Sequence, residues 1–210
     1  MRDSRGKRRL TVTFLLIRHA AHVDLDKRLS GRLTGVPLSA AGMEQAAALG
    51  RALANTSIDR IECSPLERTR QTAEAIASAI GAPAPQESDA LIEIDMGDWT
   101  GACFADLAGQ TARDRWNTER GTARIPGGET MAEAQARIAS HMRGIAATSP
   151  DGATIALVTH SDMIRAAVAD VIGLPLSQVV RFAIDPASVS RVAVGDWGGH
   201  LHSLNERIAA

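Results

Sequence analysis

The stretch TVTFLLIRH at residues 11–19 decides the fold, together with its counterpart ATIALVTH at residues 153–160. Each stretch is a run of apolar and β-branched residues that stops on a histidine, His19 in the first and His160 in the second. Continuous apolar runs of this length are typical of strands buried on both faces of a parallel sheet. Ligands of open α/β sheets bind outside the carboxyl ends of the strands, so we expect both histidines to contribute to one site.

The composition limits the kinds of protein that the chain can be. With 210 residues, of which 45% are hydrophobic, it can bury one substantial aliphatic core, and we expect residues 11–210 to form a single domain. A formal net charge of −1 gives no overall attraction to nucleic acid or to an anionic membrane. Anion binding therefore has to come from a local cluster of basic residues.

The first residues and the cysteines bear on the compartment. MRDSRGKRR at residues 1–9 is basic but precedes no apolar signal-peptide core, and no window of the sequence approaches a membrane span. We expect a disordered basic tail over residues 1–10. Two cysteines, Cys63 and Cys103, are too few for a disulfide framework and lack metal-ligand spacing. These features predict a cytoplasmic protein.

Strand patterns alternate with helix patterns along the chain. Besides the two histidine strands, we expect helices at residues 39–55, 64–80, 130–147 and 162–172, and strands at residues 60–63, 90–95, 181–184, 188–194 and 200–204. This alternation predicts an α/β fold of three layers, αβα, with a mostly parallel central sheet.

Two of the expected helices have recognisable beginnings. Ser64, Pro65 and Glu67 have the spacing of an N-cap, a first helical proline and a capping box. Thr130 and Glu133 repeat the capping-box spacing. The first of these helices would carry Arg68 in its first turn, where the free N–H groups favour anions.

The basic and acidic residues at the strand ends suit the chemistry of phosphate esters. Guanidinium groups such as those of Arg18 and Arg68 can clamp the oxygens of a phosphate dianion while a histidine attacks phosphorus. The leaving oxygen then needs a proton, and Glu93 is the best-placed carboxylic acid, at the end of an expected strand beside a glycine-rich turn.

Five segments in order resemble the histidine phosphatase superfamily, also called the phosphoglycerate mutase-like superfamily. They are Leu16-Ile17-Arg18-His19, Ser64-Pro65-Leu66-Glu67-Arg68-Thr69, Glu93 with Gly97, Pro126-Gly127-Gly128-Glu129-Thr130 and Val158-Thr159-His160. The resemblance runs from about residue 12 to residue 170 and implies a phosphoglycerate mutase-like fold.

The resemblance also implies roles for individual residues. His19 would be the phosphorylated nucleophile, with Arg18, Arg68 and His160 completing the phosphate pocket. Glu93 would be the general acid and then the base for the attacking water, and no metal or cofactor would be needed.

A loop and several departures from the family pattern add to this set. Ser30, Gly31 and Arg32 come from the loop that helps to enclose the phosphate in relatives, and Ser161 follows the second histidine. Ala20 and Ser161 stand where the family usually has glycine, and Ala21 and Leu25 replace an acid and an asparagine. His22 is an additional imidazole, either a substrate contact or a residue of the loop surface.

These inferences together predict a metal-independent phosphomonoesterase that hydrolyses a small phosphorylated metabolite through a phosphohistidine. A phosphoglycerate mutase-type transferase and a catalytically silent phospholigand-binding protein remain alternatives, and a homodimer remains open. A further hypothesis concerns basic residues before the Gly127-Gly128 turn, one or two of which would grip an anionic group remote from the scissile phosphate: Arg113, Arg115, Arg120 and Arg124. A solvated basic face is the alternative explanation.

Overall fold

A computed structural model describes residues 10–207, so the predicted basic tail lies outside the described residues except for Leu10. Six strands form one sheet in the order β3-β2-β4-β1-β5-β6. The strands are β1 (Thr11–Arg18), β2 (Arg60–Cys63), β3 (Gln86–Glu87), β4 (Thr154–Thr159), β5 (Val189–Gly195) and β6 (Gly198–Glu206). β1 to β4 run parallel, whereas β5 and β6 are antiparallel to their neighbours.

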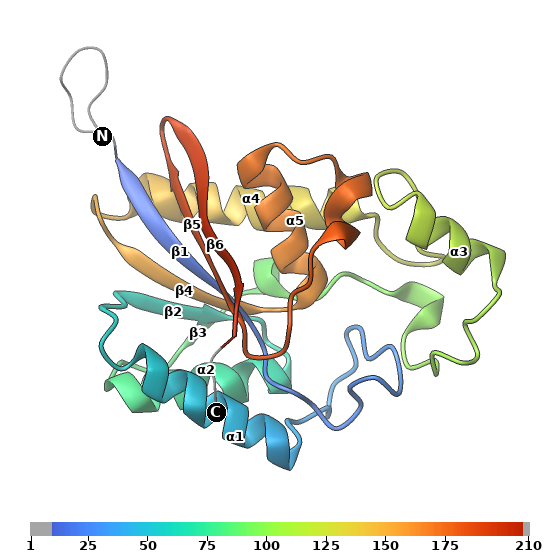
Figure 1. The fold of residues 1–210 in the computed structure, drawn as a ribbon, viewed down its shortest axis with the longest axis horizontal. Helices are drawn as coiled ribbons and strands as arrows, with labels where there is room; N and C mark the ends of the chain where they lie inside the picture. Colours follow the sequence, from blue (N-terminus) through green and yellow to red (C-terminus); the bar gives the residue numbers. More distant parts are fainter. Residues whose placement is uncertain (1–9, 208–210) are drawn as a thin grey trace.

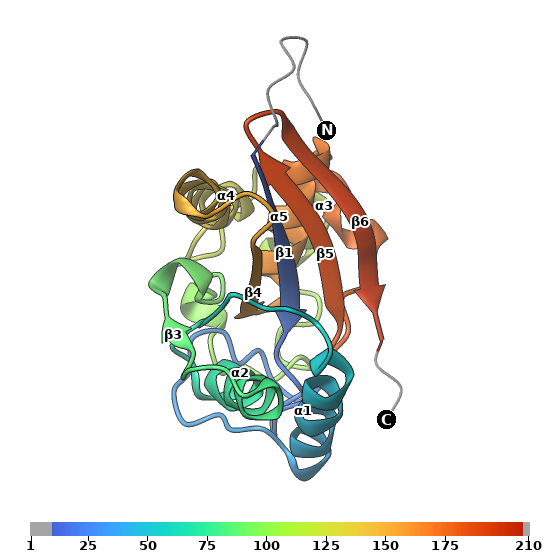
Figure 2. The same ribbon diagram turned by 90° about the vertical axis from the view of Figure 1, so that its left-hand side faces the viewer.

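Helices cover both faces of this sheet (Figures 1 and 2). They are α1 (Ala40–Leu53), α2 (Glu67–Ile80), α4 (Met131–Thr148) and α5 (Ser161–Ile172), and a shorter helix, α3 (Thr111–Thr118), lies apart from them. α1 and α2 pack on one face, and α4 and α5 on the other. The three-layer αβα fold is therefore confirmed, with an antiparallel pair of strands at one edge.

β1 is buried on both faces, as its apolar sequence predicts. Phe14 and Leu16 pack in the cluster that includes α4 and α5, whereas Leu15 and Ile17 pack in the cluster that includes α1 and α2. All four side chains are 0% exposed. Because successive side chains of a strand point to opposite faces, a strand between two helical layers has to be apolar throughout.

The pairing of β1 with β4 brings the two histidines together. Arg18 pairs with Thr159 at the last position of the parallel ladder, and the backbone N–H of His19 donates to Thr159 O at 3.0 Å. Each histidine is the next residue after its strand. The expectation that both lie in one site is thus met by the strand register.

One predicted helix beginning is wrong and the other is confirmed. α2 begins at Glu67, and Leu66 occupies the N-cap without a side-chain bond. Ser64 is buried, and its Oγ lies 2.9 Å from His160 Nε2, so the hydroxyl partners a site residue instead of capping the helix. Thr130 and Glu133 form the predicted capping box.

Two predicted strands are absent from the structure. Asp89–Leu91 is a 3-10 turn where a strand was expected at residues 90–95, and the nearby strand is the two-residue β3. The strand expected at residues 181–184 is replaced by the end of another 3-10 helix, Leu176–Arg181, and an irregular segment after it. Leu91, Ile94 and Ile184 are nevertheless buried. Their apolar spacing reflects packing against the core, which does not require a hydrogen-bonded ladder.

No helix among residues 10–207 is long and apolar enough to cross a membrane.

Two helical glycines provide a matched test of how the loop after β1 is held. A Cβ on Gly42 of α1 would lie 1.8 Å from Ala21 O, whereas a Cβ on Gly144 of α4 would meet nothing within 4 Å. We expect Gly42→Ala to lower the free energy of unfolding by roughly 1–3 kcal/mol, because the backbone has to move away. Gly144→Ala should raise it by about 0.5–1 kcal/mol, because alanine favours a helix. Urea unfolding of both variants measures the difference, and equal effects would contradict this packing.

Candidate active site

A small cavity of about 150 Å³ lies beyond the carboxyl ends of β1 and β4. Seven of the residues predicted for the site line it: Arg18, His19, Ser30, Gly31, Arg68, Glu93 and Ser161. They come from the end of β1, the first turns of α2 and α5, and two loops, whereas His160 lies behind this lining. The structure therefore gathers residues that are up to 143 positions apart (161 − 18) into one pocket.

His19 is held in a single orientation. Its ring is 3% exposed, and Nδ1 lies 2.8 Å from Ala20 O. A carbonyl oxygen only accepts, so Nδ1 carries the proton of the neutral ring and Nε2 keeps its lone pair. Burial, reinforced by the positive charges of Arg68 and Arg18, holds the pKa of His19 well below its usual value. The imidazole is consequently neutral at physiological pH, the state in which an imidazole can act as a nucleophile.

His160 packs against His19 and makes hydrogen bonds with Arg68 and Ser64. The two ring centroids are 5.1 Å apart. Arg68 Nη2 lies 3.4 Å from His160 Nδ1, which therefore accepts, and Nε2 donates to Ser64 Oγ at 2.9 Å. Burial lowers the pKa of His160 well below its usual value, with Arg68 adding to the effect. His160 is thus a neutral, buried ring that packs against His19 and accepts a hydrogen bond from Arg68.

Arg18 and Arg68 form a cradle of buried hydrogen-bond donors. Arg18 Nη1 donates to Ile184 O and Arg68 Nη2 to Gly31 O, each at 2.7 Å. The Nε atoms of both arginines, Nη1 of Arg68 and the hydroxyl of Ser30 are buried and make no hydrogen bond within the described residues. A buried charged donor without a partner is costly, so the cradle fits an oxyanion that would accept these bonds.

Glu93 brings a carboxyl group to the same cavity. Its Oε1 accepts a hydrogen bond from Ile94 N at 2.9 Å, and its Oε2 lies 3.8 Å from His160 Nδ1. Burial, with the negative charge of Asp162 as the next contribution, raises the pKa of Glu93 to about 7. A carboxyl group with this pKa can donate a proton near neutral pH and take one back.

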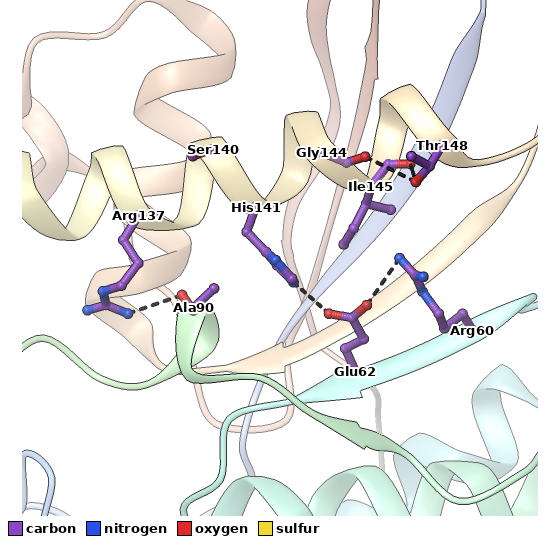
Figure 3. A pocket seen from close by; sticks show the side chains of 9 residues that line it. All are labelled: Arg60, Glu62, Ala90, Arg137, Ser140, His141, Gly144, Ile145 and Thr148. Atoms are coloured by element: carbon purple, nitrogen blue, oxygen red, sulfur yellow. Dashed lines mark hydrogen bonds and ion pairs between the residues drawn. The ribbon is translucent and has the colours of Figure 1, made fainter.

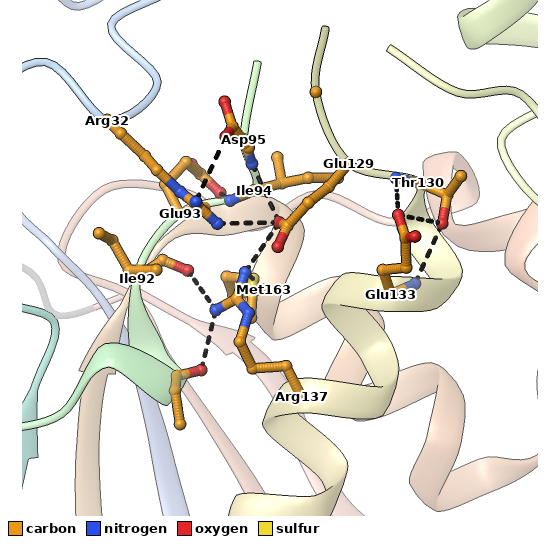
Figure 4. A network of polar contacts seen from close by, with 12 residues as sticks. Arg32, Ile92, Glu93, Ile94, Asp95, Glu129, Thr130, Glu133, Arg137 and Met163 are labelled. Atoms are coloured by element: carbon orange, nitrogen blue, oxygen red, sulfur yellow. Dashed lines mark hydrogen bonds and ion pairs between the residues drawn. The ribbon is translucent and has the colours of Figure 1, made fainter. Parts of the chain in front are cut away.

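Arg32 turns away from the expected phosphate position. Its Nε donates to Glu93 O at 2.8 Å, and its Nη2 lies 3.0 Å from Glu129 Oε2 (Figure 4). The prediction of Arg32 as a phosphate ligand needs correction, because its guanidinium is occupied by the segment that carries Glu93. The length of the loop after His19 left this position ambiguous in the sequence.

Two features of the site were not predicted from the sequence. Ser64 is a partner of His160. Asp162 lines the pocket and is bound by Arg120 at 3.0 Å and Arg165 at 2.9 Å. The position of Asp162, two residues after His160, could have indicated that it lies in the pocket. Its pairing with Arg120 depends on a tertiary contact.

His22, which the sequence left between two roles, lines the cavity. Its ring centroid is 5.3 Å from that of His19, and its Nδ1 accepts from Asp24 N at 3.2 Å. Burial, with Arg68 and Arg18 adding to it, lowers the pKa of His22 to about 4. Its Nε2 therefore carries a proton as a neutral donor.

The basic residues before the Gly127-Gly128 turn are mostly engaged with protein partners. Arg120 binds Asp162 and lies 5.0 Å from the Trp116 ring centroid, while Arg115 pairs with Glu119 and Arg124 with Glu133. Arg113 has its guanidinium carbon 5.8 Å from the centroid of Phe104, a residue that lines the cavity. Of the four arginines, only Arg113 therefore remains a candidate for binding an anionic group of the substrate remote from the scissile phosphate.

A larger groove of about 580 Å³ lies between β2 and α4 (Figure 3). Its central carboxylate, Glu62, is 2.6 Å from His141 Nε2 and 3.1 Å from Arg60 Nη2. Both carboxylate oxygens of Glu62 are therefore engaged, and the groove lies outside the histidine cavity. Among residues 10–207, no group of three or more His, Cys, Asp or Glu side chains could hold a metal ion.

Comparison with known proteins agrees with this geometry. The family model described as histidine phosphatase superfamily (branch 1) matches residues 14–207. Phosphoserine phosphatase 1 of Hydrogenobacter thermophilus is 32% identical over 199 residues, which cover 92% of each chain. A "Probable phosphoglycerate mutase" of Salmonella choleraesuis is 32% identical over 180 residues, covering 84% of this chain and 82% of its own.

Solved structures of other proteins share the fold. The α-ribazole phosphatase of Shigella flexneri superposes with a TM-score of 0.81 at 26% identity, covering 94% of this chain and 98% of its own. The family match spans both histidine strands and nearly the whole described domain. The chain is therefore an enzyme of the histidine phosphatase superfamily.

Proposed function

We propose that this enzyme is a metal-independent phosphomonoesterase of the histidine acid phosphatase type, which hydrolyses a small phosphorylated metabolite. The proposal rests on two features that occur in the same cavity. His19 is neutral and buried and has a free lone pair on Nε2, and the guanidinium groups beside it have donors without partners. A phosphate dianion supplies both the electrophile for the imidazole and the acceptors for the donors.

The first half of the reaction transfers the phosphoryl group to the enzyme. His19 Nε2 attacks phosphorus in line with the ester oxygen, forming a P–N bond as the P–O bond breaks. The leaving oxygen takes the proton of the Glu93 carboxyl group. Arg18 and Arg68 stabilise the charge on the other phosphoryl oxygens, with Ser30 and His22 as neutral donors.

The second half releases phosphate. The Glu93 carboxylate removes a proton from a water molecule, whose oxygen attacks phosphorus while the P–N bond breaks. The electron pair of that bond returns to Nε2, and His19 is again neutral. Because the ring nitrogen Nδ1 remains bonded to Ala20 O, the same tautomer is ready for the next substrate.

The apolar side chains that line the cavity suit a leaving group with apolar surface. Leu25, Leu29, Met96 and Phe104 line it, accompanied by Asp26 and Arg28. Arg28 is paired with Asp24 at 3.5 Å. A strongly anionic leaving group would therefore meet few cations apart from Arg113, so we favour a substrate whose second half is neutral or zwitterionic.

The nucleophile can be identified by trapping. Brief exposure to a labelled phosphate ester followed by rapid denaturation should leave label on the protein that is acid-labile and stable to alkali. His19→Ala should abolish the label and reduce turnover by several orders of magnitude, as loss of a covalent nucleophile does. Label retained in full by His19→Ala would rule out this residue.

The loss of activity on replacing Glu93 should be larger for esters whose leaving group needs a proton. Glu93→Gln should reduce kcat/KM for an alkyl phosphate about a hundredfold or more and for 4-nitrophenyl phosphate far less. The pKa of Glu93 near 7 implies that kcat/KM for the alkyl ester falls as pH rises through about 7, because the acid loses its proton. The variant should lack this descending limb. An unchanged limb would assign it to another group.

Water should be the final acceptor of the phosphoryl group. Only 33 residues separate Glu93 from Gly127, and mutases of the superfamily insert a longer segment here that keeps the intermediate bound. A pocket that releases its product admits water. We expect phosphate release to account for nearly all turnover, and 3-phosphoglycerate with catalytic bisphosphoglycerate to yield little 2-phosphoglycerate. Isomerisation faster than phosphate release would favour the mutase, and inactivity with all phosphate esters would favour a silent binding protein.

A further inference from the structure

We propose that Arg137, Glu129 and Arg32 form a positioning network that sets the place of the Glu93 carboxyl group during proton transfer. The inference rests on the proposed function, since it assigns to these residues an effect that passes through the general acid. None of the three lines the cavity, and Arg32, which the sequence predicted beside the phosphate, donates to the backbone of Glu93 instead.

The segment that carries Glu93 lacks the usual support of a strand. Residues 89–95 contain a single 3-10 turn and make no ladder with the sheet. Its carbonyl groups therefore need other donors, because buried backbone groups are costly when unpaired. Thr159 supplies one, since its hydroxyl donates to Leu91 O at 2.6 Å.

Arg137 of α4 donates to three more of these carbonyl groups. Its Nη1 donates to Asp89 O at 3.4 Å, to Ala90 O at 3.1 Å (Figure 3) and to Ile92 O at 2.8 Å (Figure 4). The planar guanidinium can hold several carbonyl groups in a fixed arrangement, which the single ammonium of a lysine cannot. The helix α4 is thereby fastened to the backbone just before Glu93.

Glu129 completes the support on the other side of Glu93. Its Oε2 accepts from Asp95 N, Arg137 Nη2 and Arg32 Nη2, each at 3.0 Å. Arg32 Nε in turn donates to Glu93 O at 2.8 Å. The backbone is therefore gripped before, at and after residue 93, and one carboxylate joins the two guanidinium groups (Figure 4).

This grip determines where the carboxyl group can lie. Glu93 Oε1 is bonded to the adjacent Ile94 N, so the side chain follows its own backbone. A displacement of the backbone moves the acid away from the leaving oxygen, and misplacement of about 1 Å can cost roughly a hundredfold in rate. The effect should appear only where the acid is needed, namely in the breaking of an alkyl ester bond.

The test compares kcat/KM for an alkyl phosphate with that for 4-nitrophenyl phosphate. Arg137→Ala and Glu129→Gln should lower the alkyl value about tenfold to a hundredfold and the aryl value by less than about threefold. Arg143→Ala is the matched control, because Arg143 lies on the same helix and pairs with Asp170 at 3.0 Å, away from Glu93. It should leave the alkyl-to-aryl ratio unchanged.

A second control separates positioning from stability. Glu133→Ala removes the capping box of α4 and should lower the thermal midpoint without altering the ratio. If Arg137→Ala does not fold, Glu129→Gln carries the test, since glutamine preserves the shape of the side chain and an acceptor oxygen.

Combination with Glu93→Gln decides whether the network acts through the acid. In that background, Arg137→Ala and Glu129→Gln should produce no additional change in the ratio, because residues acting as a unit are not additive. An additional change in the ratio would overturn the proposal, as would single variants that behave like Arg143→Ala. If Glu93→Gln itself leaves the alkyl-to-aryl ratio unchanged, Glu93 is not the general acid. The proposed function then fails at this residue, and a network that positions Glu93 has no role in proton transfer.

Discussion

The parallel pairing of β1 with β4 is the constraint on which the site depends. Register matters because the last paired positions, Arg18 and Thr159, are each followed by a histidine. A shift of β1 against β4 by one residue would place its apolar side chains on the opposite faces of the sheet. Both faces of β1 are covered by helices, and the packing of different side chains on each face specifies the register.

Burial then gives the site its chemical character. Removal from water disfavours charge on His19 and His160, and the adjacent guanidinium groups disfavour it further. The same removal from water disfavours charge on the Glu93 carboxyl group and raises its pKa to about 7. One environment thus gives neutral imidazole rings beside a carboxyl group that titrates near neutral pH, while Arg18 and Arg68 stay charged.

The segment from residue 89 to residue 95 illustrates how the protein supports an active-site residue outside regular structure. A strand would have its carbonyl groups satisfied by a neighbour, whereas here Arg137, Arg32 and Thr159 donate to them. Side-chain donors can point in directions that a sheet ladder does not allow. This freedom lets Glu93 reach a cavity that lies beyond the ends of β1 and β4.

The sequence by itself determined the layers of the fold and most of the members of the site. Apolar runs ending on His19 and His160, a helix beginning near Arg68 and the family pattern sufficed, because burial periodicity and strand-end chemistry are local properties. Only the tertiary structure decided the orientation of Arg32, the partnership of Ser64 with His160 and the irregular path around Glu93. Each of these depends on which donors and acceptors meet across distant parts of the chain. The spacing of residues in the sequence does not predict these hydrogen bonds, because the same serine can cap a helix or bind an imidazole.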